Sequence, residues 1–185
     1  MSDRVSPAGE PFSDDIQAWI DKTMPPGVPP LRLFTTLARD ERLFKKFFAG
    51  GLLDKGHLSL RQRELVIDRT TALCGAEYEW GVHVAFFASR IGLTDNQRFS
   101  IVHGSAEDPC WSEEDRLLLR MCDELQGHCT LSDGLWNSLR ARYSEEAMLE
   151  LLMVAGFYRT VSYLANSLQL PLEPYAARFP NPPAH

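Results

Sequence analysis

Six segments of this chain begin with the same local signal for the start of a helix, and this repetition constrains the fold more than any other feature. Each segment follows a Ser or Thr whose side-chain oxygen can accept a hydrogen bond from a free backbone N–H group of the first turn. The six N-cap residues are Ser13, Ser59, Thr94, Ser112, Ser132 and Ser144. Apolar residues follow at three- and four-residue spacing, and no alternating strand pattern competes. The sequence therefore predicts an all-α fold.

The expected helices are separated by breaks rich in proline and glycine. Residues 25–30 (PPGVPP) end the first helix and predict a stiff connector after an N-terminal arm, which can pack on its own chain or on a neighbour. A helical pattern covers residues 31–53, with a break near Asp40. The segment from Glu145 is long and strongly apolar, which predicts a central helix or a subunit contact. The prolines of residues 173–185 predict an extended tail.

Two consecutive helices are expected in the middle of the chain. Gln62 stands three residues after Ser59, which is the pattern of a capping box, and this helix should end near Cys74-Gly75. The next helix should run from about Glu77 to Arg90. Gly92 should close it, because glycine tolerates the left-handed conformation that follows a helix.

Acidic groups and a histidine gather on these two helices. Glu79 and His83 are four residues apart, so on a helix their side chains share one face. Glu64, on the preceding helix, can point toward the same space. Catalytic chemistry, if the chain has any, is expected here.

Composition narrows the function classes. At 185 residues, with 44% hydrophobic and 24% charged residues, the chain is an ordinary globular protein of one domain. The net charge of -6 argues against nucleic-acid binding, which needs clustered Lys and Arg. No apolar run reaches the roughly 18 residues of a membrane span, and the first ten residues are too polar for a secretion signal. A cytoplasmic location is therefore expected, with no membrane partner.

The cysteine pattern favours reduced thiols. The four cysteines are Cys74, Cys110, Cys122 and Cys129, and no two of them form a C-x-x-C pair. They are too few and too scattered for a disulfide framework. Close Cys and His spacing is also lacking, apart from His128-Cys129, so no metal site is predicted.

Several motifs together resemble the carboxymuconolactone decarboxylase family. They are R-E-L-V-I (63–67), Y-E-W-G-V-H (78–83), R-I-G-L-T-D (90–95) and S-E-E-A-M-L-E-L-L-M-V-A-G-F-Y (144–158), with Asn166 further on. The interval between R-E-L and Y-E-W-x-x-H is the most specific part of the resemblance, which covers residues 31–172.

The resemblance implies an all-helical, alkyl hydroperoxidase D-like fold that assembles into a homo-oligomer (dimer, trimer or hexamer). Its pocket would be lined by the helices that carry Glu64 and His83. The chain then divides into an arm and connector (1–30), a carboxymuconolactone decarboxylase-like domain (31–172) and a tail (173–185).

The peroxidase branch of the same fold carries a Glu and then C-x-x-C-x-x-x-H. With His83 and Glu64 matched to that pattern, Ala76 and Glu79 stand where the two redox cysteines would be. A disulfide cycle needs two thiols within bonding distance, so the resemblance favours the branch without thiol redox chemistry. Cys74, two residues before the first of these positions, has no partner nearby in the sequence.

Decarboxylation of a lactone acid requires a proton donor and polar groups for the developing charge. His83 is the expected donor, and Glu64 or Glu79 would raise its pKa toward the working pH. The expected reaction is a cofactor-independent lyase reaction on a small carboxylated lactone or ring-derived acid.

Four further residues are candidates for substrate binding. Arg63 can clamp a carboxylate with its planar fork of donors. Tyr78 and Trp80 can form pocket walls or belong to the core, with the core favoured for Trp80. Asn166 can face the pocket, a neighbouring subunit or solvent.

Asp68 stands four residues after Glu64, where the family pattern more often has an apolar residue. An ion pair with Arg61, Arg69 or another base is the favoured interpretation.

Two other functions stay open. One is an alkylhydroperoxidase-type antioxidant oxidoreductase that uses Cys74 as a lone peroxidatic thiol. The other is a non-catalytic oligomer that binds a small ligand without turning it over.

Overall fold

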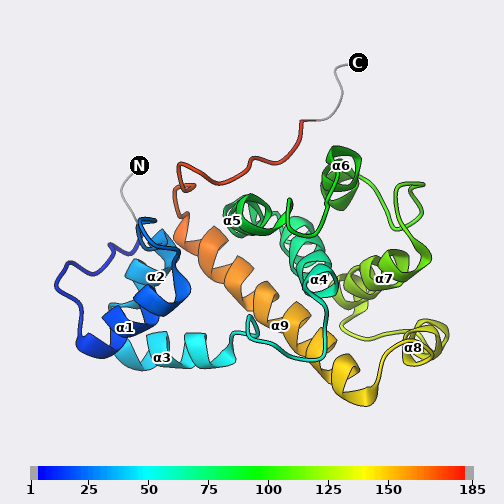
Figure 1. Cartoon of the computed structure of the whole chain (residues 1–185), viewed down its shortest axis with the longest axis horizontal. Helices are drawn as coiled ribbons and strands as arrows, with labels where there is room; N and C mark the ends of the chain where they lie inside the picture. The colour runs from blue at the N-terminus through cyan, green and yellow to red at the C-terminus, as the bar shows by residue number, and fades with distance from the viewer. Residues whose placement is uncertain (1–3, 182–185) are drawn as a thin grey trace.

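A computed structural model describes residues 4–181 of the chain, and it contains nine helices in this range (Figure 1). They are α1 (Asp14–Thr23), α2 (Arg32–Leu37), α3 (Glu41–Gly50), α4 (Leu60–Leu73), α5 (Glu77–Phe87), α6 (Asp95–His103), α7 (Glu113–His128), α8 (Asp133–Arg140) and α9 (Glu145–Leu168). No strand occurs among the described residues. The predicted all-α class is confirmed.

All six predicted N-caps are present, each accepting a hydrogen bond from a backbone N–H of its own helix. The helices opened by Ser59 and Thr94 carry complete capping boxes. The break expected near Asp40 separates α2 from α3, and the Asp40 carboxylate caps α3 through the Leu43 N–H. Local side-chain chemistry therefore fixes where most helices begin.

The two central helices, α4 and α5, end at glycines in the left-handed conformation. Gly75 has a φ of 62° and Gly92 a φ of 64°. In both turns the residue after the glycine donates a hydrogen bond to a carbonyl five residues earlier, Ala76 to Thr71 and Leu93 to Ala88. This is the Schellman arrangement that glycine favours. The regular part of α5 ends at Phe87, three residues before the predicted end, because residues 88–92 already form the closing turns.

Helix α4 lies at the centre of the molecule and packs against α5, α6, α7 and α9 (Figure 1). Every residue from Arg63 to Thr71 is buried, although six of these nine are polar or charged. Helix α9 runs alongside α4 and α5 and buries one face. On its other face Leu149, Met153 and Tyr163 are more than half exposed.

The N-terminal arm packs on its own chain. Helix α1 contacts α3, where the rings of Trp19 and Phe48 lie 5.5 Å apart between centroids. Phe48 in turn contacts Phe34 of α2 and Phe44 of α3. Aromatic stacking therefore joins α1, α2 and α3 into one end of the molecule.

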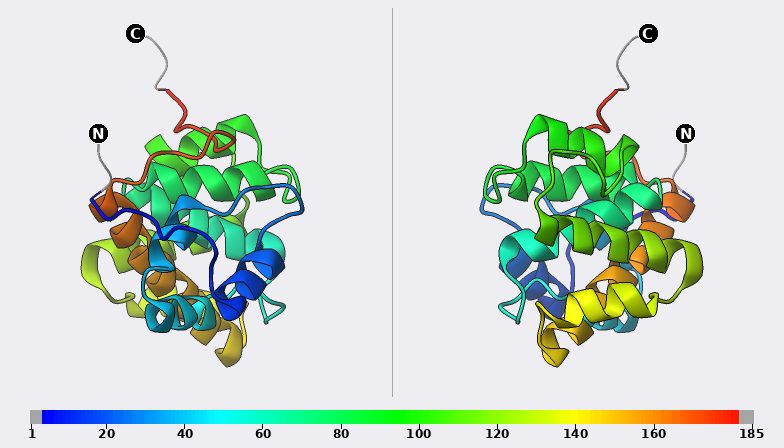
Figure 2. Two further views of the ribbon diagram at one scale, coloured as in Figure 1. Left: turned by 90° about the vertical axis from the view of Figure 1, so that its left-hand side faces the viewer. Right: turned by 90° about the vertical axis from the view of Figure 1, so that its right-hand side faces the viewer.

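The C-terminal segment crosses the outer side of α5 and reaches α6, as both views in Figure 2 show. The Ala177 N–H donates to the Gly81 carbonyl (3.0 Å), and Phe179 packs on Trp80 with ring centroids 5.1 Å apart. This part of the tail has no helix, as expected, and residues 182–185 lie outside the described residues. The division of the chain at residues 30 and 172 stays a prediction. No helix in residues 4–181 is both long and apolar enough to cross a membrane.

Candidate active site

His83 lies between two carboxylates in the interior of the protein. Its Nδ1 atom is 2.7 Å from Glu64 Oε2, and its Nε2 atom is 3.4 Å from Glu79 Oε1. All three side chains are buried, and Glu64 is 0% exposed. The structure thus brings together the three residues that the sequence proposes as catalytic.

Two helices place these groups. Glu79 and His83 stand one turn apart on α5, so they share a face, as their spacing predicts. Glu64 comes from α4, which packs closely against α5 after the turn at Gly75. The short connection fixes the relative position of the helices and so determines that Glu64 meets the imidazole.

Arg63 neutralises part of the buried negative charge. Its Nε and Nη2 atoms lie 3.0 and 2.9 Å from Glu64 Oε1, and its Nη1 donates to the Leu53 carbonyl at 2.9 Å. Glu64 therefore has a cation on each carboxylate oxygen, which stabilises its ionised form. Arg63 was a candidate substrate clamp, but in this structure its main partner is Glu64.

The surroundings of His83 favour the imidazolium form. Burial by itself lowers the pKa of His83, but the charges and hydrogen bonds of Glu64 and Glu79 outweigh it and raise the pKa to about 10. Aromatic rings enclose the imidazole: Tyr158 meets it edge-on at 4.9 Å, and Phe87 lies 5.5 Å away. A fixed positive charge in a dry site can stabilise negative charge that develops on a bound molecule.

Asp68 does not form the ion pair predicted for it. Arg61 pairs with Asp115 of α7, and Arg69 with Asp123 of the same helix. Asp68 is 2% exposed, and its Oδ1 atom has no hydrogen-bond partner among the described residues. Burial, the largest cause, raises the pKa of Asp68 well above its usual value, Glu64 raises it further, and His83 opposes the shift. The prediction was wrong because α7 supplies acids that are nearer to both arginines.

Glu79 also has an unused oxygen. Its Oε2 atom is buried without a hydrogen-bond partner among residues 4–181. Buried acceptors are normally satisfied, so the free oxygens of Glu79 and Asp68 are unusual. They offer sites where a small polar molecule or water can bind.

Three other predicted residues are engaged elsewhere. The Tyr78 hydroxyl donates to Glu173 Oε1 at 2.6 Å and accepts from the Leu33 N–H at 3.1 Å, so it ties the tail and α2 to α5. Trp80 is a core residue that packs on Phe179. Asn166 donates to the Cys74 carbonyl at 2.9 Å. The structure gives none of the three a contact with His83 within residues 4–181.

The rings that enclose the imidazole were largely missed from the sequence. Tyr158 belongs to a motif of the resemblance, but its contact with His83 depends on how α9 packs against α5. Phe87 has a weak local signal, since it stands four residues after His83 on the same helix face.

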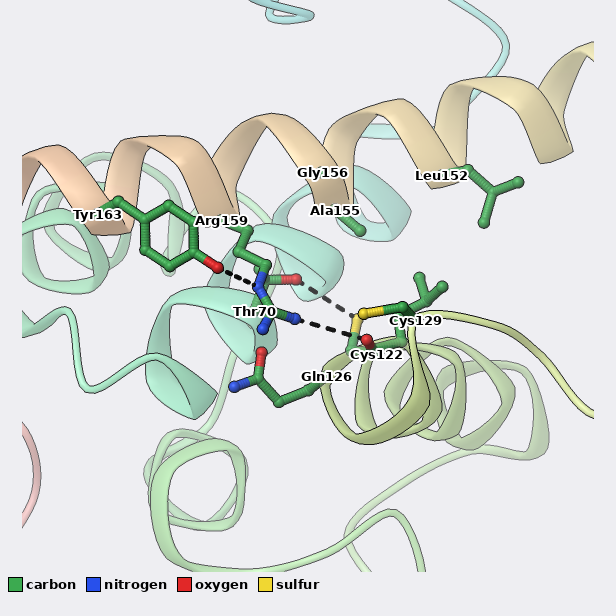
Figure 3. Close-up of a pocket in the computed structure, with 10 residues that line it drawn as sticks. Thr70, Cys122, Gln126, Cys129, Leu152, Ala155, Gly156, Arg159 and Tyr163 are labelled. Carbon is green, nitrogen blue, oxygen red and sulfur yellow. Dashed lines mark hydrogen bonds between the residues drawn. The ribbon is translucent and has the colours of Figure 1, made fainter.

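Open space is found away from this cluster. A cavity of about 280 Å³ lies between α7 and α9, with Thr70 of α4 beneath it (Figure 3). Arg159 extends across it and donates to the Tyr163 hydroxyl at 2.8 Å. Its walls include Cys122 and Cys129 of α7, and Gln126 between them contacts Cys74. The resemblance predicts a pocket at Glu64 and His83, and in this structure both side chains are buried.

Thiols and metals are the remaining candidates for reactive groups. Cys74 is half-buried at the end of α4, and its Sγ lies 3.8 Å from Gln126 Oε1 rather than near His83. The cysteines of the described chain are all unpaired. In residues 4–181, no group of three or more His, Cys, Asp or Glu side chains is arranged to hold a metal ion.

Comparison with models of protein families gives a match over the helices that carry the cluster. The family model described as "Carboxymuconolactone decarboxylase family" matches residues 41–119, which include Glu64, Glu79 and His83. A comparison with curated proteins finds no match.

Solved structures share the fold. An uncharacterized peroxidase-related protein from Silicibacter sp. TM1040 superposes with a TM-score of 0.79 at 15% identity, covering 93% of this chain and 92% of that one. A peroxidase-related protein from Ralstonia eutropha JMP134 with an alkylhydroperoxidase AhpD core gives 0.75 at 17% identity, covering 94% and 95%. The debrominase Bmp8 gives 0.71 at 15% identity, covering 95% of each chain. The family model therefore covers the helices that carry the His83 cluster, and the chain as a whole shares the all-helical AhpD-like fold of these structures.

Proposed function

We propose that the protein is a cofactor-independent enzyme that decarboxylates a small carboxylated lactone or related ring-derived acid. One observation carries the proposal: a buried imidazole lies between two carboxylates, with Ala76 and Glu79 at the positions where the peroxidase branch has its cysteines. This arrangement suits acid/base and electrostatic chemistry better than thiol redox chemistry.

The proposed reaction breaks the bond between a ring carbon and its carboxylate. Carbon dioxide leaves, and the electron pair of that bond delocalises onto the lactone carbonyl oxygen. A proton then adds to the ring carbon, and the carbonyl forms again. The enzyme must therefore stabilise an oxyanion and supply one proton.

We assign the oxyanion to His83. Because its pKa is about 10, the ring keeps both protons at neutral pH and is a weak acid. The Nδ1 proton is held by Glu64 at 2.7 Å, whereas the Nε2 contact with Glu79 is longer at 3.4 Å. A substrate oxygen can therefore replace Glu79 at Nε2 at a smaller loss of hydrogen bonding.

A cation for the substrate carboxylate is available beside the cluster. Arg90 stacks over Phe87 at 5.1 Å, and Phe87 contacts His83. Arg90 forms no ion pair among the described residues, whereas Arg63 is held by Glu64. We therefore propose Arg90, in addition to the predicted Arg63, as the cation that a substrate carboxylate meets first.

The test is a turnover screen of the wild-type protein with lactone acids and, in parallel, with organic hydroperoxides. Release of carbon dioxide supports the proposal. We expect His83→Ala to reduce it by at least about 100-fold, while helix content and oligomer size persist. His128→Ala, at an exposed histidine on α7, is the matched control. Full turnover by His83→Ala would contradict the assignment.

The same screen addresses the two other functions. Hydroperoxide reduction that disappears in Cys74→Ser would support the thiol peroxidase, and a ligand that binds without being consumed would support the non-catalytic oligomer. The contact of Cys74 with Gln126, on the far side of α4 from His83, weighs against a shared thiol–imidazole site.

Self-association is part of the proposal. The exposed apolar side chains Leu149, Met153 and Tyr163 of α9 offer a surface for a second copy. Size-exclusion chromatography with light scattering tests this, and a monomer at micromolar concentration would contradict it.

A further inference from the structure

Asp68 is a buried acid that has no cation of its own. It lies on α4 one turn after Glu64 and is 2% exposed. Glu64 is compensated by Arg63 and His83. Arg61 and Arg69 of the same helix pair with acids of α7 rather than with Asp68. An isolated buried carboxylate is strongly unfavourable, so the group stays neutral by keeping its proton.

The titratable groups around Asp68 come from three helices. Glu64 of α4 and His83 of α5 act on Asp68, and Asp68 in turn acts on the Tyr158 hydroxyl of α9. Glu64 and His83 have opposite charges and form a close pair, so their effects on Asp68 partly cancel. Burial therefore dominates, and it raises the pKa of Asp68.

The proposed reaction needs such a group. His83 is held as a charged imidazolium by carboxylates on both ring nitrogens, so its protons are not readily given to carbon. Both carboxylate oxygens of Glu64 are already engaged, Oε1 by Arg63 and Oε2 by His83, so neither is placed to meet a substrate. A neutral carboxylic acid next to this pair fits the role of donor.

We propose that Asp68 is the proton donor of this site, giving its carboxyl proton to the ring carbon that has lost carbon dioxide. This inference rests on the proposed decarboxylation. The O–H bond of Asp68 breaks as the new C–H bond forms, and Asp68 is left as a carboxylate. A proton from solvent then restores the acid, so one proton is consumed for each carbon dioxide released.

The unpartnered Oδ1 atom supports this role. It is buried and has no hydrogen-bond partner within residues 4–181, so its hydrogen-bonding capacity is available to a substrate. The same helix face carries Glu64, which already touches His83. A substrate oxygen bound at His83 would therefore lie on the side of α4 that Asp68 faces.

The experiment compares wild type, Asp68→Asn and Asp133→Asn, the last being an exposed aspartate on α8. Asparagine keeps the shape and removes the acidic proton. We expect Asp68→Asn to fold normally, to be at least as stable as wild type at pH 7, and to release carbon dioxide about 100- to 10,000-fold more slowly. Asp133→Asn should match wild type.

Two readouts separate a donor from a merely structural residue. The kcat of wild type should fall at alkaline pH as Asp68 ionises, and the residual activity of Asp68→Asn should keep only the fall that deprotonation of His83 causes near pH 10. Infrared spectroscopy at pH 7 should find a protonated carboxyl band in wild type that is absent in Asp68→Asn.

The outcomes distinguish the two proposals. If wild type releases carbon dioxide and Asp68→Asn does so at the same rate, the donor assignment fails while the decarboxylase stands. The absence of the protonated carboxyl band also overturns it. If wild type releases no carbon dioxide from any lactone acid, the proposed function itself fails, and the infrared band then reports only that Asp68 is neutral.

Discussion

The cluster around His83 and the cavity between α7 and α9 differ in buried charge and in open volume. The cluster concentrates buried charge with little space, because Arg63, Glu64, Glu79 and His83 are all buried. The cavity has open volume with mostly apolar walls and one arginine, Arg159, which is already bonded to Tyr163 (Figure 3). Open volume and buried charge therefore point to different parts of this molecule.

The difference lies in the energetic demand of each region. The apolar wall of a cavity buries no charge, so it needs no compensating partner. Buried ionised groups persist only when partners compensate them, and loss of one partner is strongly destabilising. Substitutions in the cluster are therefore expected to be costly to stability. Buried ionisable groups with specific charge partners are also typical of active sites.

The largest expected effect is that of breaking the cluster at Glu64. Glu64→Gln removes the charge that compensates both Arg63 and His83, so we expect a loss of about 3–5 kcal/mol in unfolding free energy. Chemical denaturation at pH 7 measures it. Glu113→Gln, which breaks the exposed pair with Arg142, is the control and should change stability by less than about 1 kcal/mol. Equal effects would mean that the cluster is not compensated as described.

The next effect is a pH dependence confined to the cluster. The pKa of His83 in the folded protein, about 10, lies above the unfolded value of about 6.5. Its stabilising contribution is therefore fully present below about pH 6.5 and is lost as the pH rises toward 10.

Wild type should lose on the order of 2–4 kcal/mol more than His83→Gln over this interval. Urea denaturation at pH 6 and pH 9.5 measures the difference. Parallel curves for the two proteins would show that the imidazolium is not stabilised by Glu64 and Glu79.

The smallest effects come from two glycines inside helices, one in each region. A Cβ at Gly81 would overlap the Ala177 carbonyl oxygen of the tail, whereas a Cβ at Gly156 beside the cavity would meet no atom within 4 Å. We expect Gly81→Ala to cost about 1–3 kcal/mol by displacing the tail. Gly156→Ala should gain about 0.5–1 kcal/mol, because alanine favours the helix.

Thermal unfolding measures both glycine variants, and tryptophan fluorescence reports whether Phe179 leaves Trp80. A loss of stability in Gly156→Ala, together with a smaller oligomer, would indicate that this face of α9 is covered by another copy. A neutral Gly81→Ala would show that the tail does not hold α5.

Helix starts could be predicted from single residues because an N-cap side chain bonds to the first turn of its own helix. Ser59 and Gln62 complete their capping box with no help from the rest of the fold. The Glu79–His83 pair is local for the same reason, since helical spacing puts the two on one face. Glu64 needed the family resemblance as well, because its contact with His83 crosses two helices.

Contacts between residues far apart in the sequence could not be predicted from it. Asp68 looks from sequence like one half of an ion pair, and only the packing of α4 against α7 showed that Arg61 and Arg69 have other partners. Tyr78 looked like a pocket wall, but the returning tail brings Glu173 to its hydroxyl. Each of these contacts joins residues more than fifty positions apart, beyond the reach of any local pattern.

The sequence alone therefore determined the all-α class, most helix starts and the shared helix face of Glu79 and His83, because capping, periodicity and helical spacing act over a few residues. The tertiary structure decided which charges are compensated, and in particular that Asp68 is buried without a cation. Burial and pairing depend on which helices meet, and these two properties set the protonation states on which the proposed chemistry depends.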